Sequence, residues 1–560
     1  MILFILIMLQ PAETSHSTIH RTAVGILGPP LPDIPPDILE KILHTLIETF
    51  NDGECSNRLQ QLISVSHISS SWRQIAFDCP TLWSKTLYFG DPNQARFDKV
   101  LALTQQAPLT VKAAFGHFPT ANTPVTHFEQ ILQLWAQMHR LRSIEFTFCD
   151  MPDRAMLIDA LESRPTDELH SLILRTKPAY GSRWDLRTQV GRLPWHGSGY
   201  RFPPKNLRLL HLNMCNLSPN SADIKQVESL TIIERDREAW TADKLFQWWS
   251  KIFSPLKMPA LQHLKLGHFD KAPPVEYLNE LHRNGDCSWT LPAGLKSFEI
   301  SGYAEVVALL CETIPLSSLP LLELCSNITI NVSVWSLTKP SMISALLGFW
   351  DNTLPCSYFK IKISYARLQV VRKAPDGRSV SVDFEFTQAT ASLQQDVLVY
   401  LSLPENSPNL LPDAWMELDV GVLKDTRSNG DRAHGQQRPH ELHPLFIDFF
   451  RNLRITNFYL IMHTVPPKWN WMMNGVPVPD SPWINMFQTQ IDESDEFLLP
   501  TSIEHIRIHH LLLTESDFVE DFIAYDAERV RCGCAIKIVE CVSQDGDRVV
   551  LSGGAKSGAF

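Results

Sequence analysis

The sequence predicts a chain of mixed α and β structure, in which a small unit of three amphipathic helices precedes an irregular solenoid of short strands. Three observations support this prediction. Apolar residues recur at helical spacing near the N-terminus, and an L-x-x-L-x-L pattern recurs at irregular intervals in the larger part that follows. The composition, with 44% hydrophobic and 20% charged residues in a chain of 560, is that of a folded protein.

The first predicted helix lies in residues 34–47, IPPDILEKILHTLI, where apolar side chains form one continuous stripe at i, i+1, i+4, i+5 spacing. Pro35 and Pro36 suit the first helical positions, because the N–H groups there have no partner within a helix. Asp37 in the first turn complements the positive end of the helix dipole. The start of this helix is therefore well marked.

Two more helices are expected before Pro80, which should interrupt the third. The apolar positions are Leu59, Leu62 and Ile63 in the second helix and Ile68, Trp72, Ile75 and Ala76 in the third. Units this small leave a large fraction of their apolar surface exposed. The three helices are therefore expected to have a partner.

A second pattern begins at residue 141. Residues 207–217, LRLLHLNMCNL, fit the template L-x-x-L-x-L-x-x-N/C-x-L throughout, and residues 141–151, LRSIEFTFCDM, fit it with Ile, Phe and Met. This template is that of the leucine-rich repeat, in which each short strand turns alternate side chains inward and stacks on its neighbours. Looser copies begin at Leu169, Val227, Leu261, Leu295, Leu319 and Ile503, and weaker candidates at Trp415 and Ile455.

The first copies start 20 to 38 residues apart, against about 20–29 residues in a regular leucine-rich repeat, so the expected solenoid is irregular. Near residues 358–390, alternating apolar residues flank the turn KAPDG, which predicts a β-hairpin insertion. The predicted organisation is a flexible lead-in (1–30), the helical unit (31–90), a helical linker region (91–140), the solenoid (141–540) and a C-terminal tail (541–560).

The net charge and the cysteines indicate which classes of partner and which cell compartment to expect. A formal net charge of −11 argues against nucleic acid, whose binding needs clustered Lys and Arg. The 11 scattered cysteines favour free thiols in the cytoplasm or nucleus. The N-terminal run MILFILIMLQ is shorter than the about 20 residues that span a bilayer, and no membrane association is expected. The run resembles the apolar segment of a signal peptide, but it lacks the basic residues that precede such a segment, since the first is Arg21.

No catalytic, cofactor or metal site is expected, and an enzyme is disfavoured. HELH at 440–443 lacks the i, i+4 histidines of a zinc metalloprotease. The thiols Cys532, Cys534 and Cys541 have no fourth partner at ligand spacing. GGAKSG at 553–558 departs from the phosphate-binding loop, because Ala555 stands where glycine is needed.

Residues 34–84 resemble an F-box. IPPDILEKIL is similar to the opening of that motif, and residues 65–84, VSHISSSWRQIAFDCPTLWS, are similar to its end. The matches in type include Trp72, Arg73, Ile75, Ala76, Pro80, Leu82 and Trp83, whereas Ser69 and Ser70 replace the usual Cys and basic residue. The resemblance implies docking on a Skp-family adaptor, which links the chain to a cullin-RING ubiquitin ligase of the SCF type. The solenoid would then bind a protein substrate, whose identity the sequence does not specify.

The adaptor-binding residues that this resemblance implies are Ile34, Pro35, Ile38, Leu39, Ile42, Leu43, Leu62, Val65, Ile68 and Trp72. Pro35, Ile38, Ile42 and Val65 are expected to face the partner most directly, whereas Trp72 is expected to be largely internal. The alternative function is a leucine-rich-repeat interaction scaffold. In that case the F-box-like helices cap the solenoid and the chain has no role in a ligase.

Overall fold

The structure is a computed structural model. It describes residues 34–49, 55–87, 93–114, 126–148, 166–176, 205–213, 224–233, 258–269, 292, 294–304, 307–308, 311, 327–334, 340–348, 355–364, 367–386, 397, 399–403, 406–420, 449, 453, 455–462, 472–473, 476–477, 501–509, 525–527, 529–542 and 548–552.

The N-terminal end of the described chain is helical, with α2 (Pro36–Glu48), α3 (Cys55–Ser66), α4 (Ser70–Asp78) and α5 (Pro80–Thr86). Proline marks the start of α2, as predicted. The third predicted helix ends before Pro80, as expected. A fourth short helix then begins at Pro80 itself, because the fixed φ of proline suits a first helical position. The Ser69 side chain caps α4 by accepting a hydrogen bond from the Trp72 N–H at 3.3 Å.

A tryptophan compensates for the donor that Pro80 lacks. The carbonyl of Ala76 would bond the N–H four residues later, but that residue is Pro80, which has none. The indole Nε1–H of Trp83 donates to this buried carbonyl at 2.7 Å instead. Phe77 stacks on the same indole, with ring centroids 5.6 Å apart. Trp83 therefore fixes the junction between α4 and α5.

The region expected to be a helical linker also contains the first strand of the sheet. After α6 (Gln94–Leu103) come β1 (Leu109–Ala114), α7 (Thr126–Ala136) and the short 3₁₀ helix η1 (Met138–Arg140). β1 pairs in parallel with β2 (Leu141–Phe148), so the sheet starts before residue 141. The buried Arg140 guanidinium ties these elements together by donating to Thr104 Oγ1 at 2.8 Å and to the Ala107 carbonyl at 3.2 Å.

Parallel strands then follow one another in chain order. They are β3 (Ser171–Thr176), β4 (Leu209–Asn213), β5 (Ser229–Ile233), β6 (His263–Phe269), β7 (Ser297–Tyr303) and β8 (Asn327–Val334), with a second 3₁₀ helix, η3 (Ile224–Gln226), before β5. The copy expected at Leu319 is out of place. The strand here starts at Asn327, and Ile328 rather than a residue of 319–324 aligns with Phe298.

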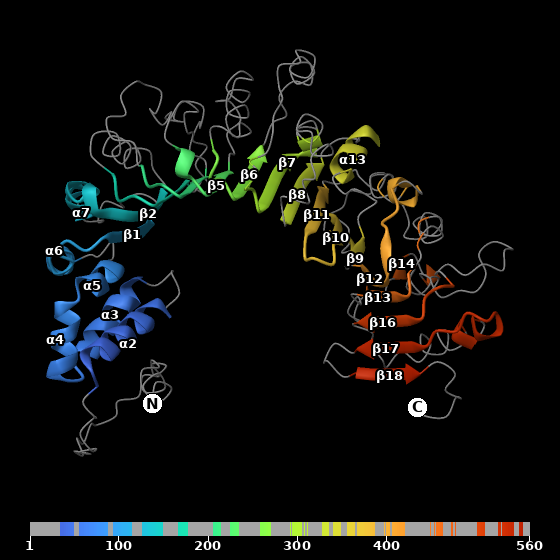
Figure 1. Cartoon of the computed structure of the whole chain (residues 1–560), viewed down its shortest axis with the longest axis horizontal. Helices are drawn as coiled ribbons and strands as arrows, with labels where there is room; N and C mark the ends of the chain where they lie inside the picture. Colours follow the sequence, from blue (N-terminus) through green and yellow to red (C-terminus); the bar gives the residue numbers. More distant parts are fainter. Residues whose placement is uncertain are drawn as a thin grey trace, which may run out of the picture.

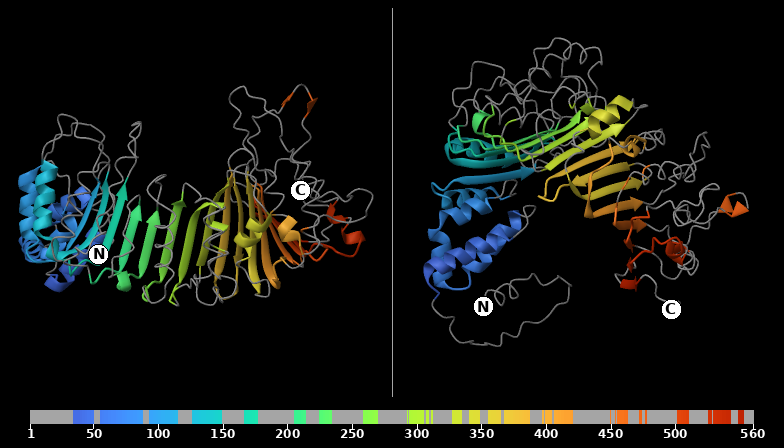
Figure 2. Two further views of the ribbon diagram at one scale, coloured as in Figure 1. Left: turned by 90° about the horizontal axis from the view of Figure 1, so that it is seen from above. Right: turned by 45° about the vertical axis from the view of Figure 1, so that its right-hand side comes forward.

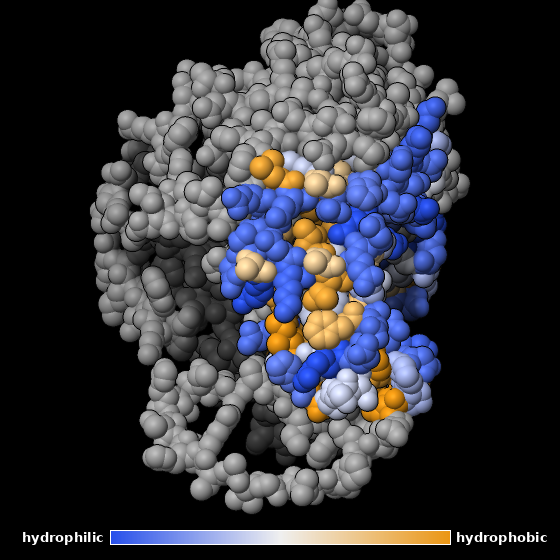
Figure 3. Space-filling model, turned by 90° about the vertical axis from the view of Figure 1, so that its left-hand side faces the viewer, coloured by the Kyte–Doolittle hydropathy of each residue, from blue (hydrophilic) through white to orange (hydrophobic). Residues whose placement is uncertain are grey.

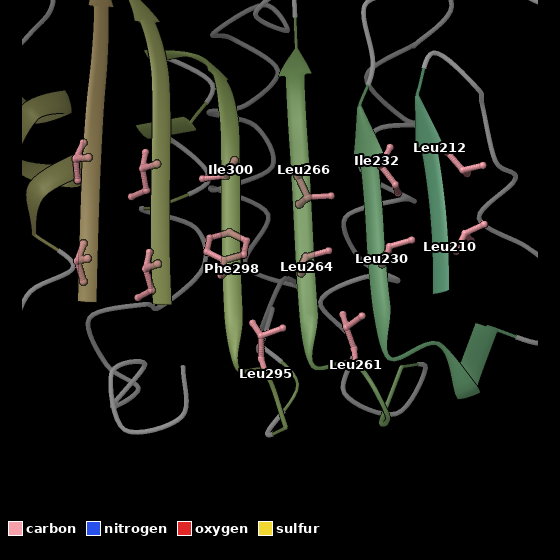
Figure 4. Close-up of a cluster of buried hydrophobic side chains, with 14 of the residues drawn as sticks. Leu210, Leu212, Leu230, Ile232, Leu261, Leu264, Leu266, Leu295, Phe298 and Ile300 are labelled. Atoms are coloured by element: carbon pink, nitrogen blue, oxygen red, sulfur yellow. The ribbon is translucent and has the colours of Figure 1, made fainter. Parts of the chain in front are cut away.

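The strand register is the one that the repeated pattern predicted. The second apolar position of each copy pairs with that of the next, in the row Ile144, Leu172, Leu210, Leu230, Leu264, Phe298 and Ile328. Figure 4 shows part of this row, with the apolar side chains of neighbouring strands stacked beside one another. All members are at most 1% exposed, and each buried aliphatic side chain contributes about 1.5–3 kcal/mol.

The parallel order is interrupted by an antiparallel meander of β9 (Cys356–Ser364), β10 (Arg367–Lys373) and β11 (Ser379–Phe386). The predicted hairpin around the KAPDG turn is β10 and β11, and Gly377 supplies the positive φ of 88° in that turn. The segment expected to be its first strand is in fact two strands. β11 joins β8 in parallel, so the meander is inserted into the same sheet.

The remaining strands of this sheet are β12 (Leu410–Val420), β13 (Asn457–Met462), β16 (His505–His509), β17 (Ile538–Val542) and β18 (Arg548–Ser552). A separate two-stranded ribbon is formed by β14 (Met472–Met473) and β15 (Val476–Pro477). The copies at Ile455 and Ile503 are in register, but the one at Trp415 is two residues out, because Met416 aligns with Phe458. The expected tail contains β18, which pairs with β17, so the sheet extends beyond residue 540.

Apart from β14 and β15, the described strands form one open, mostly parallel sheet of 16 strands, from β1 at one edge to β18 at the other. Figure 1 shows this sheet bent into an arch, and Figure 2 shows its strands side by side along the arch. Helix α13 (Pro340–Leu347) lies on the outer side, where its buried Ile343 and Leu346 join the core. The opposite side, here called the inner face, carries the partly exposed side chains that alternate with the buried ones.

Candidate functional site

The first candidate surface is a row of apolar residues on α2. Pro35, Ile38 and Ile42 lie at intervals of three and four residues, so they share one side of the helix. Pro35 and Ile38 are exposed, Ile38 by 42%, and Ile42 is partly buried against the core. These three residues are called the α2 stripe. Figure 3 shows the left-hand side of the molecule in Figure 1, where α4, α6 and α7 lie, and apolar side chains there form a broken strip bordered by hydrophilic ones.

The ten residues implied by the F-box resemblance fall into two groups. The first group is exposed or partly exposed and consists of the three residues of the α2 stripe together with Ile34 and Ile68, of which Ile68 is exposed by 42%. The other five are buried in the core of the helical unit, namely Leu39, Leu43, Leu62, Val65 and Trp72. Trp72 is internal as expected. Val65 was expected to face a partner, but it is 0% exposed, because α3 turns this side towards the other helices.

A second candidate site joins α2 to the start of α5. Glu40 and His44 lie one turn apart on α2, and Cys79 immediately precedes α5. The Cys79 Sγ lies 3.3 Å from Glu40 Oε1 and 3.7 Å from His44 Nε2, and these last two atoms are 3.8 Å apart. The three residues, called the Cys–His–Glu cluster, offer the sulfur, nitrogen and oxygen donors that bind divalent transition metals.

The surroundings of this cluster shift the pKa values of His44 and Cys79 in opposite directions. Burial, followed by the positive charge of Lys85, lowers the pKa of His44, which favours the neutral imidazole that binds metals. Burial raises the pKa of the Cys79 thiol, while its hydrogen bond to Thr81 lowers that pKa. The Lys85 ammonium lies 3.3 Å from His44 Nδ1 and bonds the Glu48 carboxylate, which lowers the pKa of Glu48.

The third candidate surface lies on the inner face of the sheet. Tyr358, Trp415, Tyr459 and Arg507, called the inner-face cluster, come from β9, β12, β13 and β16, and register places them on the same face. The Arg507 guanidinium lies over two rings, 5.2 Å from the centroid of Trp415 and 5.9 Å from that of Tyr459. Its Nε–H also donates to Glu540 at 2.6 Å.

A buried glutamate, Glu417, bonds one member of this cluster, Tyr358. Glu417 is only 6% exposed, and its carboxylate accepts hydrogen bonds from the Tyr358 hydroxyl and from Lys360. Burial and then this hydrogen bond raise the pKa of Tyr358, so its phenol stays protonated. The Tyr358 ring is thus held by a hydrogen bond, and the Trp415 and Tyr459 rings contact the Arg507 guanidinium, while part of each side chain stays exposed.

Sequence reasoning missed both the metal-type cluster and the inner-face cluster. Glu40 and His44 show only an i, i+4 spacing, and Cys79 lies 35 residues after His44, so no local motif joins them. The inner-face residues come from four segments, and one of them, Trp415, was assigned to the core by the two-residue register error. The signal that could have revealed it was the alternation in the sequence of the apolar Ala414, Met416 and Leu418 with Trp415, Glu417 and Asp419, which places the second set on the opposite face of the strand.

The comparisons with known proteins leave the family open. No family model matches the chain, and no curated protein matches it. Among the described residues, no helix combines the length and apolar character needed to cross a bilayer. The HELH and GGAKSG segments and the side chain of Cys541, from which no site was expected, lie outside the described residues.

Proposed function

We propose that the chain is a non-enzymatic substrate-recognition subunit of an SCF-type cullin-RING ubiquitin ligase. In this proposal the N-terminal helices form an F-box-like unit that docks on a Skp-family adaptor. The strand-rich region acts as an irregular leucine-rich-repeat solenoid and binds a protein substrate. The observation that carries the proposal is the α2 stripe, in which Pro35 and Ile38 stay exposed in a unit that already has its own buried core.

The two sides of α2 serve different purposes in this proposal. Leu39, Leu43 and Leu46 complete the core of the helical unit. Ile38 is not needed for that core, yet it exposes a large apolar side chain in line with Pro35 and Ile42. Amphipathic helices bind hydrophobic grooves through anchors at i, i+3 and i+4, and the spacing of the α2 stripe suits that mode. The sequence resemblance of residues 34–84 to the F-box names the groove as that of a Skp-family adaptor.

The inner-face cluster supports the substrate-binding half of the proposal. Trp, Tyr and Arg are the residue types that most often dominate protein–protein binding energy. Here they lie together on one face. Glu417 fixes Tyr358, and Glu540 fixes the Arg507 guanidinium that lies over Trp415 and Tyr459, so less entropy is lost on binding. A protein substrate is therefore the class of ligand proposed for this surface.

The alternative, a scaffold without a ligase role, requires the helices to act only as a cap on the sheet. Among the described helices, α5 makes a close contact with β1, and the α2 stripe lies on a different helix. Covering the first edge of the sheet therefore does not account for the apolar side chains of the stripe. This favours adaptor docking over a cap.

Co-purification of the full chain with a purified Skp-family adaptor tests the proposal. We expect the wild-type chain to retain the adaptor and the variant Ile38→Asp to lose it, because an aspartate would be desolvated at the interface. Leu132→Asp on α7 is the matched control, because Leu132 is a similarly exposed aliphatic residue on another helix. A folded wild-type chain that retains no adaptor would contradict the proposal and favour the cap.

A further inference from the structure

We propose that Glu40, His44 and Cys79 form a binding site for Zn²⁺ or a chemically similar divalent transition metal. The donors are a thiolate sulfur, an imidazole Nε2 and a carboxylate oxygen, which is a zinc-type ligand set. A water molecule or the Thr81 hydroxyl would complete a four-coordinate site, since Thr81 Oγ1 lies 3.1 Å from the sulfur and 3.3 Å from Nε2. This site is independent of the adaptor-binding role proposed for the α2 stripe.

The distances between the donors suit a single tetrahedral ion. Bonds of about 2.0–2.3 Å to oxygen, nitrogen and sulfur place the ligand atoms roughly 3.3–3.6 Å from one another. The three observed separations are 3.3, 3.7 and 3.8 Å, so each ligand needs to move by only a few tenths of an ångström. The 3.8 Å between His44 Nε2 and Glu40 Oε1 is too long for an N–H···O hydrogen bond. It exceeds the spacing of two ligands of one tetrahedral ion by a few tenths of an ångström, which rotation of the two side chains can close.

The fold presents the three ligands without rearrangement of the backbone. The i, i+4 spacing of Glu40 and His44 places both side chains on one face of α2. Pro80 starts α5 and Trp83 fixes the α4–α5 junction, so Cys79 is held at the turn facing that helix. A bound ion would link α2 to this junction, because its ligands come from segments more than 30 residues apart.

Lys85 is the residue that would limit the affinity of the site. Its ammonium lies 3.3 Å from His44 Nδ1, whereas an imidazole bound to metal through Nε2 carries a proton on Nδ1 that needs an acceptor. Lys85 and its partner Glu48 are exposed by 35% and 62%, so their ion pair can separate at little cost. Glu48, one turn after His44 on α2, can then accept a hydrogen bond from the Nδ1–H of His44.

Titration of the full chain with Co²⁺ tests the site, because a Co²⁺–thiolate bond has a characteristic charge-transfer absorption. We expect one equivalent to bind with this absorption and to be displaced by Zn²⁺. Cys79→Ser should abolish the thiolate signal, and Glu40→Gln, which changes a largely exposed side chain, should weaken binding at least about tenfold. Cys532→Ser, at an exposed thiol elsewhere, is the control and should bind as the wild type does.

Lys85→Met separates a metal site from a hydrogen-bonded cluster. It removes the opposing charge and should strengthen Co²⁺ binding roughly tenfold. Circular dichroism shows whether each variant is folded. The proposal is overturned if the folded wild-type chain gives no Co²⁺–thiolate absorption, if that absorption survives in Cys79→Ser, or if neither Glu40→Gln nor Lys85→Met alters the affinity.

Discussion

His211 provides a pH-dependent test of how the sheet is packed. It lies on the inner face of β4, next to Ile173 of β3 and Thr231 of β5. Its Nε2 is buried and, among the described residues, has no hydrogen-bond partner. Burial, and then the positive charge of Arg175, lowers the pKa of His211 to about 4, with Lys265 acting in the same direction and Glu145 opposing it. The ring is therefore neutral in the folded chain at pH 5, where an unfolded histidine is protonated.

The sign and size of the effect follow from linkage. Because the unfolded chain binds the proton more tightly, the stability contributed by His211 is complete above pH 6.5 and is lost as the pH falls towards 4. Between pH 7 and pH 5 the shift corresponds to about 2 kcal/mol, and partial exposure of the ring reduces this to about 1–2 kcal/mol. The loss should be local, because β4 pairs only with its neighbours β3 and β5 in the sheet.

Hydrogen exchange of the backbone amides in β4 and β5, corrected for intrinsic rates, measures this loss. We expect protection in the wild-type chain to fall by at least about fivefold more between pH 7 and pH 5 than in His211→Gln, which cannot be protonated. Amides of β17 and β18, far along the sheet, serve as the internal control and should respond equally in both chains. Equal pH dependence of β4 and β5 in the wild type and the variant would refute the reasoning.

Two further predictions concern buried donors. Trp83→Phe should lower the free energy of unfolding of the helical unit by about 1–3 kcal/mol, because the Ala76 carbonyl loses its donor and Pro80 cannot replace it; thermal unfolding followed by circular dichroism measures this, and an unchanged melting temperature would contradict it. Arg529→Lys should reduce hydrogen-exchange protection of β16 roughly tenfold or more, because the fully buried guanidinium donates from Nη2 to the carbonyls of Thr501 and Ile503 and from Nε to that of Cys534, and one ammonium nitrogen cannot reach all three. Wild-type protection of β16 in that variant would show that the carbonyls find other donors.

The sequence predicted the strands best where the apolar pattern had a fixed register. Leu210 and Leu230 sit where the template placed them, because every copy must bury the same positions against its neighbour. The pattern failed where another segment satisfied the same constraint. Residues 319–324 matched the template by letter, but Ile328 and Ile330 alternate equally well and form the strand. β1 was missed because Val111 follows Leu109 by two residues, whereas the template needs three, as between Leu141 and Ile144.

The candidate site was predictable only in part. Helical periodicity located the apolar positions of α2 but could not divide them between core and surface, because Leu39 and Ile38 belong to one continuous stripe in the sequence. Val65 was placed on the wrong side for the same reason, since the packing of α3 decides it. The Cys–His–Glu cluster depends on the distance between α2 and the residue before α5, which is a property of the tertiary structure.

Calorimetric titration of a purified Skp-family adaptor into the full-length chain tests the central claim most directly. The account predicts a saturable one-to-one complex whose Kd rises at least about 100-fold in Ile38→Asp, a change of about 3 kcal/mol, and is unaltered in Leu132→Asp. The absence of binding by a folded wild-type chain, or equal affinity of the wild type and Ile38→Asp, would contradict the assignment of the α2 stripe as an adaptor-docking surface.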